Sequence, residues 1–216
     1  TGVATPLGSD AATLNGDVNP NGQPTTAHFQ YGLTADYGSI LPVSSSLSGA
    51  ATQAVTATLP GLLPATTYHF RLAATNLLGA NLGQDQVFTT LAPIEAWRLQ
   101  WFGTTADSGP AADSTITTSD GMPNLVKYAL GLNPLVPTNS PVVGDIRTGY
   151  LRLTAPKNPQ ATDVSFLVEV TANLKAAWTT NGTTVDINTS TLLRVHNNTP
   201  VAGSGGGFIR LRVSRP

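Results

Sequence analysis

The chain has 216 residues, a length that accommodates two domains of the common size of ~100–150 residues. Charged residues make up only 11% and give a net charge of −1, so no broad positive field would attract nucleic acid or an anionic membrane. The sequence contains no cysteine, which excludes disulfides and thiol chemistry. We therefore expect neither nucleic acid nor membrane insertion, and no apolar run approaches the ~20 residues of a membrane-spanning helix.

Residues 1–90 are predicted to form an antiparallel β-sandwich. The stretches "TAHFQYG" and "TTYHFRLAATN" alternate apolar and polar side chains at the period of a half-buried strand. Turn-rich runs such as "NGDVNPNGQP" separate the strands at the spacing typical of a sandwich.

These residues resemble a fibronectin type III domain of the kind found in large secreted bacterial proteins. The family's L-x-x-L-x-P-x-T-x-Y signature falls on Leu59, Leu62, Pro64, Thr66 and Tyr68. The resemblance implies that Tyr68 packs the corner that leads into the sixth strand. It also implies extended residues ahead of Thr1, so we expect a truncated first strand, produced either by native processing or by a fragment boundary.

Residues 91–140 are predicted to form a helical linker. In "APIEAWRLQWFG" a short helix after Pro93 would bury Trp97, Trp101 and Phe102, which favours a core cluster over a binding platform. The run "NLVKYALG" has apolar residues at helical spacing and ends at Gly131, a natural helix stop.

Residues 141–216 return to a strand pattern in "GYLRLTAP", "DVSFLVEVTAN" and "FIRLRVSR". They resemble the C-terminal β-domain that often follows a W-R…F-G…D-G-x-x-N-L-x-x-Y-A-L-G-x-x-P segment in the same secreted proteins. The expected fold is therefore mainly β: a fibronectin type III-like sandwich, a short helical linker and a second β-sandwich-like domain.

The stretch "ADSTITTSDGMPNLVKYALGLNP" is similar to a calcium-binding loop that leads into a helix. An EF-hand-type loop takes oxygen ligands at fixed positions, and Asp120 and Gly121 fit the fifth and sixth of them. The first, third, ninth and twelfth positions then carry Ile116, Thr118, Asn124 and Lys127. Because Ile116 has no oxygen ligand and Lys127 brings a cation, we expect a degenerate loop (Asp113, Asp120, Asn124) without calcium. The alternative is that Asp113 rescues a weak site.

No catalytic constellation or cofactor site is predicted. The glutamates Glu95 and Glu169 lie in different segments, so no close carboxylate pair for acid–base chemistry can be inferred. The glycine-rich run 202–208 lacks the features of a phosphate loop or nucleophile elbow and indicates a flexible hairpin loop. His28 and His69 are expected to point outward from neighbouring strands, which favours surface pairing over a metal site.

Charge is distributed unequally along the chain. Residues 1–90 hold one Arg against four Asp, whereas residues 141–216 hold eight basic against four acidic residues. Arg152, Arg210 and Arg212 alternate with apolar neighbours and should line the outer face of a sheet. This face is either a solvated surface that prevents edge aggregation or a docking surface for the acidic end of the next molecule.

The leading hypothesis is a non-catalytic extracellular or cell-surface structural protein that associates head to tail into a homopolymer by strand addition. The donated strand would be Thr1–Thr5 or Gly207–Pro216. The candidate interface residues are Thr1, Gly2, Val3, Ala4, Thr5, Arg152, Phe208, Arg210 and Arg212.

The alternative is the C-terminal display module of a larger secreted protein, with a carbohydrate or cell-surface partner. It predicts an exposed aromatic row, whereas the aromatic residues of the last segment are expected to face the core. These residues are Tyr150, Phe166, Trp178 and Phe208.

Overall fold

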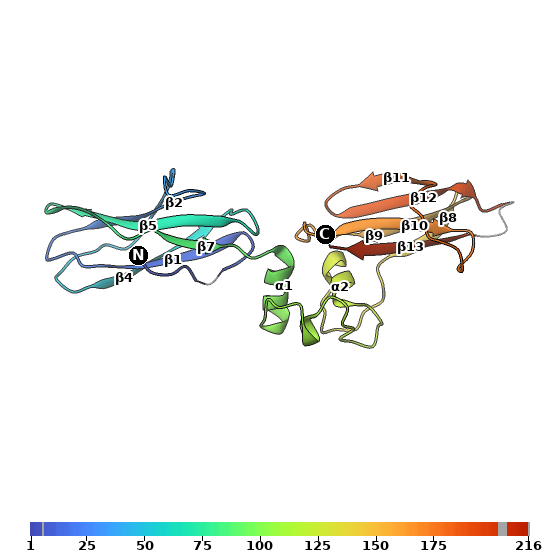
Figure 1. Cartoon of the computed structure of the whole chain (residues 1–216), viewed down its shortest axis with the longest axis horizontal. Helices are drawn as coiled ribbons and strands as arrows, with labels where there is room; N and C mark the ends of the chain where they lie inside the picture. Colours follow the sequence, from blue (N-terminus) through green and yellow to red (C-terminus); the bar gives the residue numbers. More distant parts are fainter. Residues whose placement is uncertain (6, 203–206, 216) are drawn as a thin grey trace. The chain divides into compact units, whose positions relative to one another are not determined.

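The computed structural model describes residues 1–5, 7–202 and 207–215, and the chain divides into two compact units, Thr1–Ala92 and Pro93–Pro216. The predicted fold class is confirmed: the chain is mainly β, with a fibronectin type III-like sandwich first and a β-sandwich-like domain after two helices (Figure 1). From Pro93 onward, the segment predicted as a linker belongs to the second unit. Residues 203–206 of the predicted glycine loop, and Pro216, lie outside the described residues.

The first unit consists of two antiparallel sheets. One sheet pairs β1 (Ala11–Val18) with β4 (Gln53–Pro60). The other has the order β3 (Ser39–Pro42), β2 (Thr26–Gly32), β5 (Thr67–Asn76), β6 (Gly79–Leu82), and β7 (Gln86–Thr89) also pairs with β5. The alternation predicted for "TAHFQYG" and "TTYHFRLAATN" thus places one face of β2 and β5 against β1 and β4.

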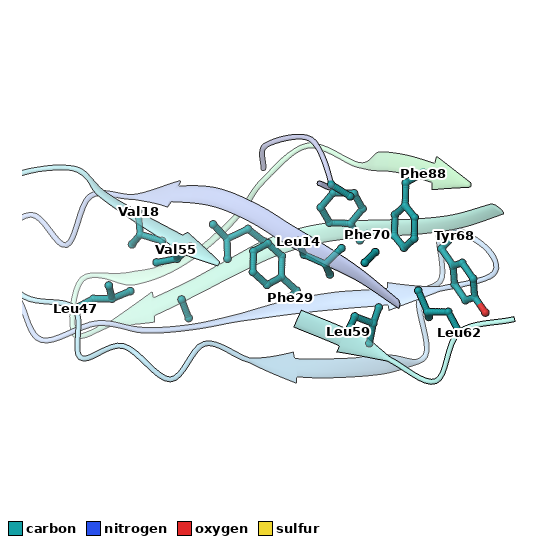
Figure 2. Close-up of a cluster of buried hydrophobic side chains, with 14 residues drawn as sticks. Leu14, Val18, Phe29, Leu47, Val55, Leu59, Leu62, Tyr68, Phe70 and Phe88 are labelled. Atoms are coloured by element: carbon teal, nitrogen blue, oxygen red, sulfur yellow. The ribbon is translucent and has the colours of Figure 1, made fainter. Parts of the chain in front are cut away.

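The core of this unit lies between the two sheets (Figure 2). Leu14, Phe29 and Phe70 are fully buried, and the Phe70 ring meets the Phe88 ring edge to face at a centroid distance of 5.7 Å. The Tyr68 ring stacks on Phe88, and its hydroxyl accepts a hydrogen bond of 3.0 Å from the Leu63 N–H. This bond fixes the corner before β5, the place at which the resemblance implied a packed tyrosine.

The second unit begins with helices and continues with two sheets. Its helical part comprises α1 (Pro93–Phe102), the 3-10 turn η1 (Gly109–Ala111) and α2 (Asn124–Leu130). One sheet has the order β11 (Thr183–Asn188), β12 (Leu192–Pro200), β9 (Tyr150–Pro156), β8 (Val143–Arg147). The other pairs β10 (Ser165–Thr171) with β13 (Phe208–Ser214). A core of Leu130, Leu153, Ala155, Val168, Leu193 and Val195 joins both sheets to α2.

The helices differ from expectation in what they bury. In α1 the buried residues are Ile94 and Arg98, while the three predicted aromatic residues are half-buried. Trp97 nevertheless packs on α2: the centroid of its ring lies 5.5 Å from that of the Tyr128 ring. Gly131 ends α2 as predicted, with φ of 72° and its N–H bonded to the Tyr128 carbonyl.

Candidate functional site

The loop that resembles a calcium site encloses the ammonium group of Lys127. Lys127 is fully buried, and its Nζ lies 2.8 Å from the Asp120 Oδ2 and also contacts the Thr118 hydroxyl. The carbonyl oxygens of Pro134 and Val136 lie 3.4 and 3.3 Å from the same nitrogen. Thr118 and Asp120 occupy the third and fifth loop positions, so the lysine brings its own charge to oxygens that would face a metal ion.

Asp120 is fully satisfied by groups of the chain. Its Oδ1 accepts a hydrogen bond from the Met122 N–H, and its Oδ2 accepts one from the Thr138 N–H, both of 3.0 Å. The hydrogen bond from Lys127, together with these backbone donors, holds the pKa of the Asp120 carboxyl well below its usual range. Asp120 therefore ties the loop to the segment 134–138.

The other two residues of the predicted degenerate loop have structural contacts of their own. Asn124 is fully buried and donates from Nδ2 to the carbonyls of Pro110 and Ala112, at 2.8 and 3.0 Å. Asp113 makes ion pairs with Arg98 and Arg215. In the part of the chain that the structure describes, no group of three or more His, Cys, Asp or Glu residues is arranged to hold a metal ion.

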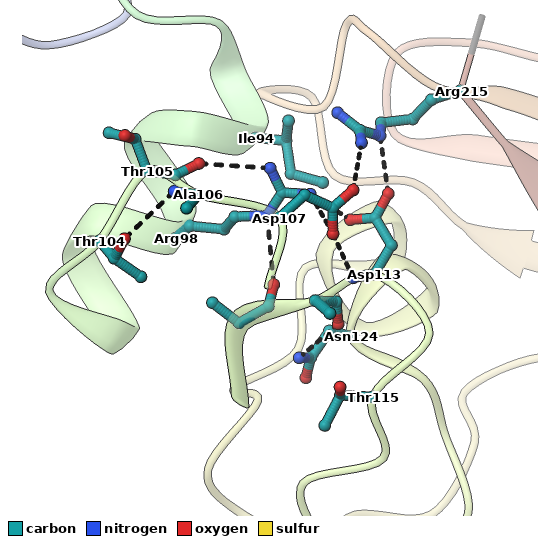
Figure 3. A network of polar contacts seen from close by, with 12 residues as sticks. Ile94, Arg98, Thr104, Thr105, Ala106, Asp107, Asp113, Thr115, Asn124 and Arg215 are labelled. Carbon is teal, nitrogen blue, oxygen red and sulfur yellow. Dashed lines mark hydrogen bonds and ion pairs between the residues drawn. The ribbon is translucent and has the colours of Figure 1, made fainter. Parts of the chain in front are cut away.

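Two arginines and two aspartates form a closed ionic network next to this loop (Figure 3). Arg98, with a side chain only 3% exposed, lies 2.5 Å from Asp113 and 3.1 Å from Asp107. Arg215 lies 2.8 Å from Asp113 and 2.9 Å from Asp107. The network neutralises the buried guanidinium of Arg98. It also links Arg215, which follows β13, to the segment between α1 and α2. Sequence reasoning missed it, because Arg98 and Arg215 are separated by more than a hundred positions.

The first five residues lie along the outer edge of β1. The Gly2 N–H donates to the Asn15 carbonyl and the Thr5 N–H to the Thr13 carbonyl, both at 2.8 Å. The Asn15 side-chain amide adds bonds to the Val3 carbonyl and the Thr5 hydroxyl, at 2.8 and 3.0 Å. Ala4 is buried whereas Val3 is 68% exposed. The Thr1 hydroxyl also accepts a hydrogen bond of 3.1 Å from the Leu72 N–H. The first candidate donor strand is therefore paired within its own unit, with Ala4 as its one buried side chain.

A groove lies between β1 and β6, and Thr1 is one of the residues that line it. It consists of two adjoining cavities of about 220 and 230 Å³, which share Asn19, Ala74 and Asn81. β6 ends the order of its sheet, and the Gly83 N–H bonds to the Leu72 carbonyl. Because antiparallel bonding alternates, Leu82 and Ala80 then direct their backbone groups away from β5. The groove thus has a strand edge along one wall.

The second candidate donor strand and the predicted arginine face are also engaged within their unit. Every residue of β13 has a partner on β10. Arg210 lies 2.8 Å from Glu169 and 4.2 Å from the Trp178 ring centroid, and Arg212 lies 3.7 Å from Glu169. Phe208 is 41% exposed. Arg152 belongs to the other sheet of this unit, where Asp145 lies 2.5 Å from its Nη2.

Two of the three histidines, His69 and His196, pair with carboxylates. His28 and His69 lie on the neighbouring strands β2 and β5, as expected, but His28 is opposite Ala73 and His69 opposite Gly32. His69 Nδ1 lies 2.9 Å from Asp85, and this bond is the main cause that lowers the pKa of the Asp85 carboxyl.

Comparison with known proteins yields only distant structural similarity. No family model and no curated protein matches the chain. A sensor domain of the anti-sigma factor RsgI4 from Pseudobacteroides cellulosolvens is 25% identical over 41% of this chain and 88% of its own, with a TM-score of 0.33.

Two longer matches are weaker still. The FN1–FN3 domains of chicken CNTN1 are 15% identical over 99% of this chain and 54% of their own, with a TM-score of 0.30. The chitinase ChiA74 from Bacillus thuringiensis is 14% identical over 99% of this chain and 25% of its own, with a TM-score of 0.27. Function is therefore inferred from the residues of this chain.

Proposed function

We propose that the protein is a non-catalytic extracellular structural module that polymerises head to tail by exchanging residues 1–5 between neighbouring copies. The observation that carries the proposal is the position of this segment on the free edge of β1, held by two backbone hydrogen bonds. An edge segment of this kind is a natural element for strand exchange.

The exchange replaces each broken hydrogen bond by the same hydrogen bond to a neighbouring copy. Asn15 and Thr13 of a neighbouring copy offer the same carbonyls and the same side-chain amide to an incoming Thr1–Thr5 segment. The tight reversal at which the Gly8 N–H bonds to the Ala11 carbonyl would open to release the segment. A copy that receives a segment from one neighbour can donate its own segment to another. Each end of such an assembly therefore keeps an unpaired strand edge, which gives open filaments.

The edge of β6 favours the same function. The outward backbone groups of Leu82 and Ala80 offer a second strand edge to an extended segment of a neighbouring copy, in the mode of β-strand addition. Exposed apolar side chains gather near this edge: Leu77, Leu78 and Leu82.

A non-catalytic role is supported by the state of the charged groups. The carboxylates of Asp113, Asp120 and Glu169 are each paired with a basic side chain. Groups neutralised in this way are poor general acids or bases near neutral pH. The extracellular location rests on the resemblance of residues 1–90 to the type III domains of secreted proteins.

An engineered disulfide tests the exchange, because the chain has no cysteine of its own. A backbone hydrogen bond of 2.8 Å joins the Thr5 N–H to the Thr13 carbonyl, which places the two residues close enough for a disulfide to be engineered between them. The Thr5→Cys/Thr13→Cys variant is oxidised at low concentration and compared with its reduced form by sedimentation velocity. We expect the reduced form to assemble and the oxidised form to stay monomeric.

A second cysteine pair serves as the control. Thr67 and Thr89 are partners on β5 and β7, with hydroxyl oxygens 2.8 Å apart, and a disulfide there leaves residues 1–5 unconstrained. This variant should assemble in both redox states. Assembly of the oxidised Thr5–Thr13 variant, or failure of its reduced form to assemble, would refute the proposal.

The alternative, a carbohydrate-binding display module, finds no aromatic row among the described residues. Trp178 lies beneath the Arg210 guanidinium, and Phe166 lies 5.4 Å from the Lys157 ammonium. Only Phe208 is substantially exposed.

A further inference from the structure

The outer face of the sheet β11-β12-β9-β8 carries a cavity of about 350 Å³. Leu153 and Val195 point into the core, so the alternation of the strands sends Arg152, Arg194 and His196 outward. His196 is the register partner of Arg152 on the adjacent strand. The residues that line the cavity are Arg147, Thr148, Tyr150, Arg152, Asp186, Arg194 and His196.

Two of the three guanidinium groups have no carboxylate partner among the described residues. Arg152 is held by Asp145 through two bonds, of 2.8 Å from Nε and 2.5 Å from Nη2. Arg194 uses its Nε for the Thr154 hydroxyl at 3.3 Å. The Arg147 side chain makes no hydrogen bond or ion pair with the described residues. The donors of Arg147 and the terminal nitrogens of Arg194 therefore remain available beside the cavity.

The electrostatic environment of this face is positive. Arg152 is the main cause that lowers the pKa of the Asp145 carboxyl, and Arg147 and Arg194 act in the same direction without a direct bond. Asp186 is engaged with His196 Nδ1 at 2.7 Å, so its charge faces the imidazole. This face therefore carries three positively charged arginines and two carboxylates, and both carboxylates are already paired.

We propose that this cavity binds the sulfate or carboxylate group of an acidic saccharide. Guanidinium groups match the planar or tetrahedral oxygens of such anions through paired N–H donors. The volume corresponds to about a dozen water molecules at ~30 Å³ each, which suits one substituted sugar ring. The Tyr150 ring, packed edge to face on His196 at 5.9 Å, offers a wall for the ring of the sugar.

A nucleic acid fits this surface less well. Asp145 and Asp186 interrupt the basic residues, and the whole chain has a net charge of −1, so no continuous track for a phosphate backbone is present on this face. The inference is independent of polymerisation, because the cavity lies in the second unit and involves none of the first five residues.

The test measures binding of the full chain to dextran sulfate oligomers by calorimetry, with uncharged dextran and free sodium sulfate as reference probes. We expect binding to dextran sulfate only, weakened about tenfold or more by Arg147→Gln and by Arg194→Gln, because each removes charge-assisted hydrogen bonds. The matched control is Arg212→Gln, which removes the same charge from a side chain that is 59% exposed on the other sheet. It should change the affinity less than twofold.

Three results would overturn the proposal. No binding of dextran sulfate would remove it outright. Equal weakening by all three substitutions would mean general attraction of charge and no site. Free sulfate that binds as tightly as dextran sulfate would assign the cavity to a bare anion and contradict the saccharide. Near-native thermal unfolding of each variant establishes that the comparison concerns folded protein.

Discussion

The Lys127 ammonium lies 2.8 Å from the Asp120 carboxylate, at the centre of a loop whose sequence is similar to a calcium site. In an EF-hand-type loop the twelfth residue supplies a carboxylate to the ion. Here the twelfth residue supplies the cation itself, and its ammonium also contacts the Thr118 hydroxyl and the carbonyls of Pro134 and Val136. We infer that Lys127 performs the cross-linking that calcium would perform, without dependence on calcium concentration.

Replacement of Lys127 by a carboxylate should restore a response to calcium. In Lys127→Glu the new carboxylate joins Asp120 and the surrounding oxygens, so the variant should be unstable without metal because two carboxylates repel. Calcium at millimolar concentration should raise its Tm by several degrees, through preferential binding to the folded state. Thermal unfolding followed by tryptophan fluorescence reports on this unit, since Trp97, Trp101 and Trp178 all belong to it.

Lys127→Gln is the control for this prediction. It removes the same charge without adding a ligand carboxylate, so calcium should leave its Tm unchanged, as in the wild-type protein. A calcium-dependent rise of the wild-type Tm would mean that the lysine has not replaced the ion.

The lowered pKa of Asp120 predicts acid destabilisation of the second unit. In the unfolded chain Asp120 takes up a proton near the ordinary aspartate pKa of ~3.9, whereas the folded state keeps it ionised. The stabilisation is therefore complete well above pH 4 and declines as the pH falls below that value. Urea unfolding at pH 5 and pH 3 should show a smaller pH effect in Asp120→Asn than in the wild type. An identical pH effect in both proteins would contradict the assignment.

Asp113 should be the critical carboxylate of the arginine network. Asp113→Asn weakens the pairing of the buried Arg98 and of Arg215 together, and loss of a partner from a buried pair costs about 3 kcal/mol. Asp107→Asn is the matched change at a side chain that is 42% exposed, and it should cost less than about 1 kcal/mol. Urea unfolding by tryptophan fluorescence measures both, and equal costs would contradict this ranking.

Gly32 should be indispensable to the first unit. A Cβ at Gly32 would lie 1.7 Å from the Tyr37 carbonyl oxygen, so Gly32→Ala must displace the turn between β2 and β3 and should cost about 3 kcal/mol or more. Gly22→Ala is the control: its φ of 80° is strained for alanine, but the space around it is open, and a cost of about 1 kcal/mol is expected. Calorimetry of the full chain should show the loss in the first unit's transition only.

The elements with strong local signals could be predicted from the sequence. The alternating pattern of β2 and β5 and the helix stop at Gly131 agree with the structure because the strand period and the left-handed glycine are local properties. The calcium-loop analogy drew attention to the loop around Asp120. The analogy treated Lys127 only as a cation that would repel calcium. The local sequence does not show that the carbonyl oxygens of Pro134 and Val136 accept hydrogen bonds from its ammonium group.

Contacts between distant segments could not be predicted. Arg98 lies in an apolar helix, where an arginine would normally face solvent. It is buried here because it forms ion pairs with Asp107 and Asp113, and Arg215 completes the network through Asp107. The cavity around Arg147 and Arg194 depends on the register of three strands, which the sequence pattern alone leaves undetermined. The pairing of the first five residues with β1 likewise required the structure.

Electron microscopy with light scattering on the natively purified protein tests the central claim most directly, at neutral pH with and without a calcium chelator. The proposed metal-free strand exchange predicts filaments that persist unchanged in the chelator. Monomers under both conditions would contradict polymerisation, and filaments that dissolve in the chelator would show that the assembly depends on a metal ion and would contradict the metal-free exchange.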